Sequence, residues 1–213
     1  MPSLAELARR LKPAGAARHR PPLPPLILMT DAVRLPDPEP ALARLPRGSA
    51  VILRHRDAAE RERLARRLAP HCRRLGLSLI VAGDARLAAA VRADGLHLPE
   101  AMLRHGRRGW RLLRRPGWLV TAAAHSPAAI RAAARAGADA VLLSPVFATA
   151  SHPGAAALGP LRFANLVRHS PLPVYALGGV SVATAPRLAG SGAAGLAAIG
   201  GLLPSQSGSG SRL

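Results

Sequence analysis

The sequence predicts a single (β/α)8 barrel, a fold of the α/β class. Eight apolar runs of strand length occur along the chain, and helical patterns separate most of them. The runs are apolar nearly throughout, which is typical of parallel strands covered on both faces. Glycine pairs follow the last two runs, where barrel enzymes commonly bind phosphate. These observations favour the barrel over the open doubly wound sheet, whose G-x-G-x-x-G motif is missing after the first run.

The expected elements follow one another in a regular order. Strands are expected at Leu26–Met29, Ala50–Leu53, Leu77–Val81, Gly95–Leu98, Trp118–Ala122, Ala140–Val146, Pro173–Leu177 and Gly195–Ile199. Helices are expected at Asp57–Leu75, Asp84–Arg92, Ser126–Ala136, Gly159–His169 and Val182–Ala189. A weak internal repeat supports this order, because similar segments each end a helical pattern and open an apolar run: Ala93-Asp94-Gly95, Ala138-Asp139-Ala140 and Ala193-Ala194-Gly195.

Composition divides the chain into three parts. A basic, proline-rich N-terminal extension covers residues 1–25 and begins with a short amphipathic helix at Ser3–Leu11. The barrel covers residues 26–204, and a Ser/Gly-rich tail at 205–213 is expected to be disordered. No run approaches the ~20 apolar residues of a membrane helix, and Cys72 is the single cysteine, so no intrachain disulfide can form. We therefore expect a soluble, cytoplasmic protein that makes no membrane contact.

The chain is strongly basic, with 30 Lys and Arg residues against 11 Asp and Glu residues and a formal net charge of +19. The arginines occur in all segments, so the charge by itself does not indicate nucleic-acid binding. The best nucleic-acid candidate is the segment Arg104–Arg115, in which arginines surround Trp110. Trp110, Leu112 and Leu113 could equally pack a helix onto the barrel while the arginines face water. No known nucleic-acid reader motif is present, so a nucleic-acid partner is not favoured.

The glycine pairs predict an anion site at the end of the barrel. Gly178 and Gly179 follow the seventh expected strand, and Gly200 and Gly201 follow the eighth. Glycine lets backbone N–H groups approach an anion without a Cβ in the way. Glycine can also end a strand simply to turn the chain. Two pairs at the two positions where barrels bind phosphate favour the phosphate interpretation.

A series of short segments resembles the thiamine-phosphate synthase and TenI family. The matching segments are Gly95-Leu96-His97-Leu98, Ala124-His125-Ser126, Gly137-Ala138-Asp139, Ser144-Pro145-Val146-Phe147-Ala148-Thr149, Leu158-Gly159, Pro173-Val174-Tyr175-Ala176-Leu177-Gly178-Gly179 and Gly192-Ala193-Ala194-Gly195. Their order and spacing match over roughly Leu26 to Leu203. The resemblance implies a (β/α)8 barrel, and it implies a phosphorylated thiazole or a thiamine phosphate as the ligand.

The residues of this chain depart from the synthase pattern at the metal site. The synthase reaction joins hydroxymethylpyrimidine diphosphate to thiazole phosphate and needs Mg²⁺ to hold the leaving diphosphate, and Mg²⁺ prefers carboxylate oxygens. The synthases have Asn-Asp where this chain has Ala82-Gly83, and a second expected acid falls on Met102. Asp84 lies one position late and fits a helix N-cap better than a metal ligand. We therefore expect no cofactor and no metal, with Mg²⁺ required only if synthase activity survives.

Other substrate-binding positions of the family are partly kept. Arg54 and Arg56 stand where the synthases have Arg and Lys, while the amide residue before them has become Ile52. In the loop after the sixth expected strand, the family's Thr-x-Thr-Lys becomes Thr149-Ala150-Ser151-His152. The resemblance implies that Arg54, Arg56, Thr149, Ser151 and His152 bind substrate. Two serines of the synthases are replaced, by Ala123 and Gly200.

The TenI branch fits the chain better than the synthases do. The resemblance implies a thiazole tautomerase, which moves a proton to aromatise a thiazole carboxylate phosphate and uses a histidine after the fifth strand as acid and base. His125 occupies that position. A proton shuttle near neutral pH suits imidazole and needs no metal. The alternative for His125 is a structural role at the start of the helix that begins with Ser126-Pro127.

Several alternatives stay open. The chain could be a thiamine-phosphate synthase with a divergent site, or a non-catalytic sensor of a phosphorylated ligand. His97 is expected to point into the barrel as a core histidine, and His55 is either part of a cationic cluster with Arg54 and Arg56 or part of a solvated charge run. No H-E-x-x-H motif or paired Cys/His spacing predicts a zinc site. Assembly into a homo-oligomer also stays open.

Overall fold

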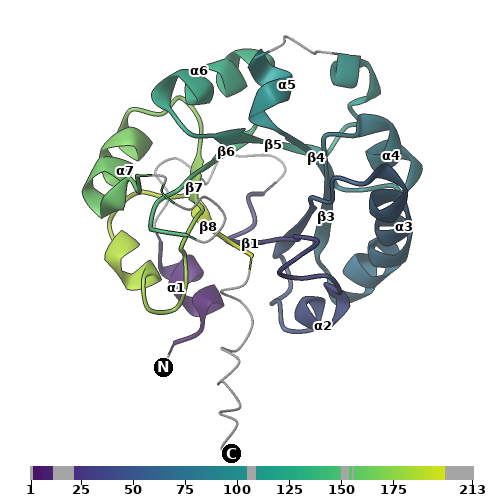
Figure 1. The fold of residues 1–213 in the computed structure, drawn as a ribbon, viewed down its shortest axis with the longest axis horizontal. Helices are drawn as coiled ribbons and strands as arrows, with labels where there is room; N and C mark the ends of the chain where they lie inside the picture. Colours follow the sequence, from purple (N-terminus) through teal and green to yellow (C-terminus); the bar gives the residue numbers. More distant parts are fainter. Residues whose placement is uncertain (1, 12–21, 105–108, 150–153, 155, 200–213) are drawn as a thin grey trace, which may run out of the picture.

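The computed structural model describes residues 2–11, 22–104, 109–149, 154 and 156–199. Eight parallel strands form a closed barrel in which each strand pairs with the next along the chain and β8 pairs with β1. Helices lie around the ring of strands (Figure 1). The strands are β1 (Leu26–Met29), β2 (Ala50–Leu53), β3 (Ser78–Ala82), β4 (Gly95–Leu98), β5 (Leu119–Ala124), β6 (Ala140–Leu143), β7 (Val174–Ala176) and β8 (Gly195–Ala198). The predicted fold class, a single (β/α)8 barrel, is confirmed.

The helices follow the strands as the sequence pattern predicts, with shorter elements between them. They are α1 (Leu4–Arg10), α2 (Glu39–Leu42), α3 (Ala58–Leu75), α4 (Ala85–Ala90), α5 (Glu100–Arg104), α6 (Pro127–Ala136) and α7 (Gly159–Arg168). Two short 3₁₀ helices, η2 (Gly109–Leu113) and η3 (Ala185–Leu188), complete the described elements. The sequence patterns did not predict α2, α5 or η2, because each is too short to show a helical period.

Side-chain caps fix where the main helices begin. Asp57, Asp84 and Ser126 each accept a hydrogen bond from the backbone N–H three residues later, at the starts of α3, α4 and α6. Asp84 is therefore the N-cap of α4, as the sequence suggests. α3 and α6 both end at a glycine with a left-handed backbone, Gly76 and Gly137.

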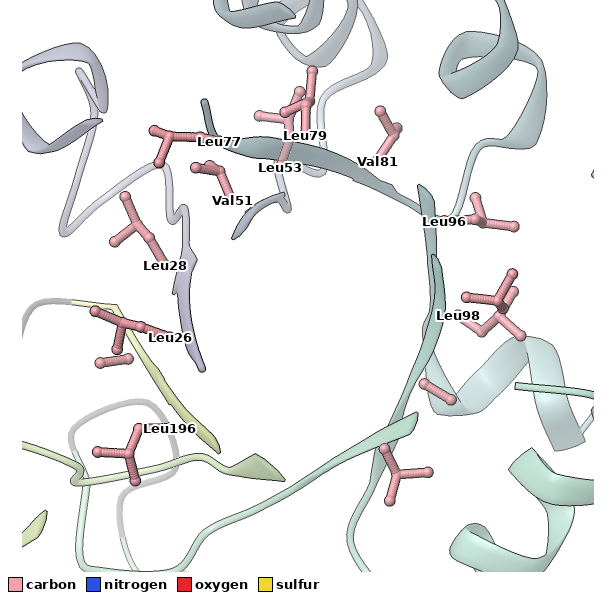
Figure 2. Packing of buried hydrophobic residues seen from close by; sticks show 14 of the residues in the cluster. Leu26, Leu28, Val51, Leu53, Leu77, Leu79, Val81, Leu96, Leu98 and Leu196 are labelled. Carbon is pink, nitrogen blue, oxygen red and sulfur yellow. The ribbon is translucent and has the colours of Figure 1, made fainter. Parts of the chain in front are cut away.

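Two apolar layers hold the barrel together. Alternate residues of each strand point outward and pack under the helices, as Leu26, Leu28, Val51 and Leu53 do in Figure 2. The residues between them fill the inside of the barrel with a second cluster, which includes Ile27, Ile52, Ile80 and Tyr175. The interior is thus a packed core and not a channel, so a ligand has to bind at an end of the barrel.

The N-terminal helix α1 packs against the outside of the barrel beside β1 and β8 (Figure 1). Ser3 and Glu6 form a capping box at its start, and Leu4, Ala8 and Leu11 are buried in the outer apolar layer. The first residues of the expected extension therefore contribute to the core of the barrel.

Two expected elements differ from the structure. The predicted helix Val182–Ala189 is only the short η3, because Pro186 lacks a backbone N–H and Gly190 and Gly192 follow closely with left-handed backbones. The expected strand Ala140–Val146 ends already at Leu143. Pro145 cannot donate a strand hydrogen bond, so the chain leaves the sheet there.

The internal repeat has a physical basis at the N-terminal end of the barrel. The backbone N–H of Asp94 donates to the carbonyl of Leu79 at 2.8 Å, and the Asp94 carboxylate accepts from the N–H of Leu79 at 2.8 Å. Asp139 makes the same pair of bonds to Val120, at 2.7 Å each. Each aspartate thereby ties the start of one strand to the preceding strand. In the third copy Ala194 keeps only the backbone bond, to Val174.

Replacing Asp94 by alanine is expected to destabilise the barrel by about 1–3 kcal/mol, since a carboxylate hydrogen bond to a part-buried N–H is lost. Asp94→Asn keeps an acceptor oxygen and is expected to lose less. Urea denaturation of both variants and of the wild type measures the difference. Equal stability of Asp94→Ala and the wild type would contradict this role.

The arginine-rich segment before β5 has a structural function in its described part. Trp110 is 5% exposed, so its ring is not available for stacking on a base. Arg111 donates to the carbonyl of Ala136 at the end of α6, and Arg114 forms an ion pair with Asp139 at 3.0 Å. These contacts support the packing alternative over a nucleic-acid partner; residues 105–108 lie outside the described part. Among the described helices none is long and apolar enough to cross a membrane.

Candidate functional site at the barrel mouth

Polar side chains gather at the carboxyl ends of three neighbouring strands. Glu100 follows β4 at the start of α5, His125 follows β5 directly, and Ser144 follows β6. The carboxyl ends of parallel strands open on the same end of a barrel, so the three residues meet at one rim. We call this end of the barrel the mouth.

His125 is held from one side by Ser144. Its Nδ1 lies 2.8 Å from the backbone carbonyl oxygen of Ser144 and 3.2 Å from the Ser144 hydroxyl. A carbonyl oxygen can only accept, so Nδ1 donates to it and Nε2 is the nitrogen that can exchange a proton. The side chain is 43% exposed, and Nε2 lies 3.9 Å from Oε2 of Glu100. The ring is therefore oriented by protein contacts and still accessible to a ligand.

A second polar group lies at the ends of β1 and β2. Arg54 lies 4.0 Å from the carboxylate of Asp31, and Arg34 forms an ion pair with the same carboxylate at 3.0 Å. Burial alone would raise the pKa of Asp31, but the hydrogen bonds and charge of Arg34 outweigh it and lower the pKa to about 2. Asp31 is thus ionised at neutral pH and holds Arg54 at the rim.

The neighbouring residues of the predicted cationic cluster do not all face the mouth. His55 is 3% exposed and its Nδ1 lies 3.1 Å from the Thr30 hydroxyl, so it does not form an exposed cluster with Arg54 and Arg56. Burial lowers the pKa of His55 and favours the neutral ring. Arg56 is exposed in the turn before α3. The cluster interpretation is therefore wrong for His55.

His97 lies inside the barrel below the mouth, as the sequence predicts. It is 3% exposed, and its Nδ1 lies 2.9 Å from the Thr121 hydroxyl on the next strand. Burial, helped by the positive charge of Arg54, lowers its pKa to about 3. His97 is therefore a neutral, hydrogen-bonded core histidine.

Gly178 and Gly179 form a tight turn after β7, against the loop that follows β6. Both have left-handed backbones, with φ of 90° and 63°. A Cβ on Gly178 would lie 2.8 Å from Cα of Pro145, and a Cβ on Gly179 would collide with the carbonyl oxygen of Ala148. Their N–H groups make no hydrogen bond within the described part of the chain. The turn therefore requires glycine and also presents two backbone donors.

The other predicted site residues are only partly described. Thr149 is half-buried in the loop after β6, next to Ala148, which contacts the glycine turn. The remaining ones lie outside the described residues: Ser151, His152, Gly200 and Gly201.

The family model and the most similar sequences point to one family. The family model for thiamine monophosphate synthase, named TMP-TENI, matches residues 33–202. The chain belongs to the thiamine monophosphate synthase family. A thiamine-phosphate synthase of Thiobacillus denitrificans is 36% identical over 177 residues, which cover 78% of this chain and 82% of that protein. One of Myxococcus xanthus is 38% identical over 188 residues, covering 83% and 84%.

A solved structure supports the same fold. Thiamine phosphate pyrophosphorylase from Pyrococcus furiosus superimposes with a TM-score of 0.64 at 22% sequence identity, covering 91% of this chain and 88% of that one. At this identity the likeness concerns the barrel alone. Membership of the thiamine monophosphate synthase family connects this chain with thiamine biosynthesis.

The carboxylates at the mouth do not fit a Mg²⁺ ion of the kind that synthase chemistry needs. Asp84 uses Oδ1 to cap α4 and Oδ2 to contact Arg61 at 3.4 Å, and Asp31 is paired with Arg34. Glu100 faces His125. Within the described ranges no group of three His, Cys, Asp or Glu residues could hold a metal ion. Asp84 and Asp31 are therefore each matched to an arginine, and Glu100 lies beside His125.

Sequence reasoning missed two residues of the mouth. Asp31 and Glu100 were not singled out because the spacings visible in the sequence pair them only with Arg34 and Arg104, which are local ion pairs. Their partners, Arg54 and His125, come from neighbouring strands more than twenty residues along the chain. The observed pairing of β4 with β5 makes the residues that follow these two strands neighbours, and the sequence does not show this pairing.

Proposed function

We propose that this chain binds a phosphorylated thiazole at the barrel mouth and transfers a proton on the thiazole ring, as a thiazole tautomerase of the thiamine monophosphate synthase family. The observation that carries the proposal is His125, whose Nδ1 is held by Ser144 while its side chain stays 43% exposed. In this reaction a C–H bond at a saturated ring carbon breaks and the proton moves to the imidazole. The proton then returns to a carbon outside the ring, where an exocyclic double bond is lost as the thiazole becomes aromatic. Nothing is oxidised or reduced, and no metal takes part.

The phosphate is proposed to bind at the glycine turn after β7. The N–H groups of Gly178 and Gly179, which make no hydrogen bond among the described residues, supply donors there, and barrels commonly bind phosphate at this position. Gly200 and Gly201 are proposed to add donors after β8. Arg54, Arg56, Thr149, Ser151 and His152 are proposed to contact the remaining polar groups of the substrate, with Arg54 suited to its carboxylate.

The phosphate proposal predicts a local NMR response. Adding inorganic phosphate or thiazole phosphate is expected to shift the ¹H–¹⁵N resonances of Gly178 and Gly179 more than those of Gly76 and Gly137, the helix-capping glycines. Substituting Gly178 or Gly179 would be a poor test, because a Cβ there meets the loop after β6 and would disturb the fold. Unchanged Gly178 and Gly179 resonances at saturating ligand would refute the site.

Thiamine-phosphate synthase is the second candidate, and the names of the relatives favour it. The residues at the expected metal positions argue against the synthase. The side chains of Ala82, Gly83 and Met102 cannot bind Mg²⁺, and the Asp84 carboxylate is engaged in its helix cap and its ion pair with Arg61. A non-catalytic sensor would bind the same ligands without turnover.

One pair of assays separates these functions. Purified protein is expected to aromatise the thiazole carboxylate phosphate, followed by absorbance, with the same rate in Mg²⁺ and in EDTA. It is expected to form no thiamine phosphate from hydroxymethylpyrimidine diphosphate and thiazole phosphate. Robust Mg²⁺-dependent coupling that Asp84→Asn abolishes would establish the synthase instead. Tight ligand binding without either reaction would establish the sensor.

A further inference from the structure

We propose that Thr30 and His55 are positioning residues for Arg54, and that they hold it where it selects a ligand with a carboxylate in addition to its phosphate. The three residues follow β1 and β2, and Thr30 contacts both of the others. This inference rests on the proposed function, because the carboxylate that Arg54 recognises is that of the thiazole carboxylate phosphate.

The Thr30 side chain takes the place of a backbone acceptor where β1 and β2 end. The Thr30 N–H donates to the carbonyl of Ile52 at 2.9 Å, which continues the parallel pairing. The next bond joins the Arg54 N–H to the Thr30 hydroxyl oxygen, at 3.0 Å. Thr30 is fully buried, so water cannot replace this acceptor. The backbone position of Arg54 therefore depends on the Thr30 hydroxyl.

His55 determines how the Thr30 hydroxyl is oriented. Its Nδ1 lies 3.1 Å from the hydroxyl, and its Nε2 is buried without a hydrogen bond in the described part of the chain. If Nδ1 carried the ring proton, both Nε2 and the buried hydroxyl proton would lack a partner. If the hydroxyl donates to Nδ1, only Nε2–H lacks one, so this arrangement costs less. Burial lowers the pKa of His55 and keeps the ring neutral, as this bond requires.

The segment around Arg54 is held on both sides. With its proton directed at His55, the Thr30 hydroxyl presents its lone pairs to the Arg54 N–H, and a hydroxyl that donates is also a stronger acceptor. After Arg54, the carbonyl of His55 accepts a hydrogen bond from Arg61 of α3 at 3.0 Å. The backbone from which the Arg54 side chain extends is therefore fixed before a ligand binds.

The guanidinium of Arg54 makes no hydrogen bond to an oxygen in the described part of the chain. Its Nη1 lies 3.9 Å from the sulfur of Met29 and 4.0 Å from Asp31, whose carboxylate is already paired with Arg34. The side chain is 37% exposed, so its donors remain available to a ligand. A guanidinium binds a carboxylate through two parallel bonds, and this geometry tolerates little displacement. Because side-chain contacts hold Arg54 only loosely, the position of its backbone decides whether the two bonds form.

The binding test compares Thr30→Val with the control Thr121→Val, which breaks a second buried hydroxyl–imidazole pair, that of Thr121 with His97. Calorimetric titration gives the Kd of thiazole carboxylate phosphate and of thiazole phosphate for each protein. The wild type is expected to bind the carboxylate ligand at least about tenfold more tightly, and Arg54→Ala to remove this preference. Thr30→Val is expected to reduce the preference by at least about fivefold, while the Kd of thiazole phosphate stays within about twofold.

Two further variants separate positioning from a general loss of stability. Thr30→Ser keeps the hydroxyl and is expected to keep most of the preference. His55→Phe keeps a ring but removes Nδ1, and its preference is expected to lie between those of the wild type and Thr30→Val; it also serves if Thr30→Val does not fold. An unchanged preference in Thr30→Val or in His55→Phe would overturn the proposal, and so would an equal loss in Thr121→Val.

A second measurement needs no ligand. The ring ¹⁵N resonances of His55 at pH 7 are expected to show an unprotonated Nδ1 and a protonated Nε2. Hydrogen exchange of the Arg54 backbone amide is expected to be at least about tenfold faster in Thr30→Val than in the wild type, and unchanged in Thr121→Val. A protonated Nδ1, or unchanged exchange in Thr30→Val, would refute the positioning role. A wild type that meets these expectations but binds neither thiazole would refute the proposed function and the selectivity, and would keep the role of Thr30 and His55 in holding Arg54.

Discussion

Replacing His125 by asparagine is expected to slow tautomerisation of the thiazole carboxylate phosphate by at least about a hundredfold. Acid–base groups typically contribute ~100–10,000-fold to a rate. The asparagine amide can still donate to the Ser144 carbonyl in place of Nδ1, so the rim keeps its shape. It cannot exchange a proton near neutral pH. The rate of aromatisation, measured at saturating substrate, reports the change directly.

Ligand affinity provides the control for the His125 variant. The phosphate is proposed to bind across the mouth at the glycine turn, so the Kd for thiazole phosphate is expected to stay within a few-fold of the wild type. Calorimetric titration of both proteins measures it. Wild-type turnover in His125→Asn would remove His125 from the mechanism, and a joint loss of binding and turnover would show that the histidine serves the ligand and not the proton.

The stability of the barrel is expected to fall steeply as the pH drops from 6.5 toward 3 because of His97. The pKa of His97 is about 3 in the folded protein, while an exposed histidine has an ordinary value of 6.5. At a pH between these two pKa values, His97 is protonated in the unfolded chain but not in the folded chain. Lowering the pH in this range therefore favours unfolding. The full difference corresponds to about 5 kcal/mol, and about 3 kcal/mol of it is expected to be lost by pH 4.5.

The matched variant for this effect is His97→Asn. Its amide replaces Nδ1 as the partner of the Thr121 hydroxyl, but it does not titrate. Urea denaturation at pH 7 and pH 4.5 is expected to show a smaller loss of unfolding free energy for His97→Asn than for the wild type, by about 3 kcal/mol. The carboxylates contribute equally to both proteins and cancel. The same acid dependence in both proteins would mean that His97 accepts a proton in the folded state.

The sequence alone was sufficient for the path of the chain around the barrel. The apolar runs predicted β1, β2 and β4 with their observed bounds, because strands buried on both faces leave an unbroken apolar signature. The starts of α3, α4 and α6 were equally visible, since an N-cap is a local interaction of neighbouring residues. The repeat of Asp94 and Asp139 was also present in the sequence, and family membership followed from short segments whose order is fixed by this path.

Only the tertiary structure determined which side chains meet at the mouth. His125 was found from its position after a strand, but its contacts with Ser144 and Glu100 join three strands. His55 shows the converse: it follows the end of β2 as Arg54 does, yet its ring is buried against the Thr30 hydroxyl, which follows β1. Partners from different strands have no sequence spacing of their own. Closure of the barrel creates their distances, and with them the chemistry of the site.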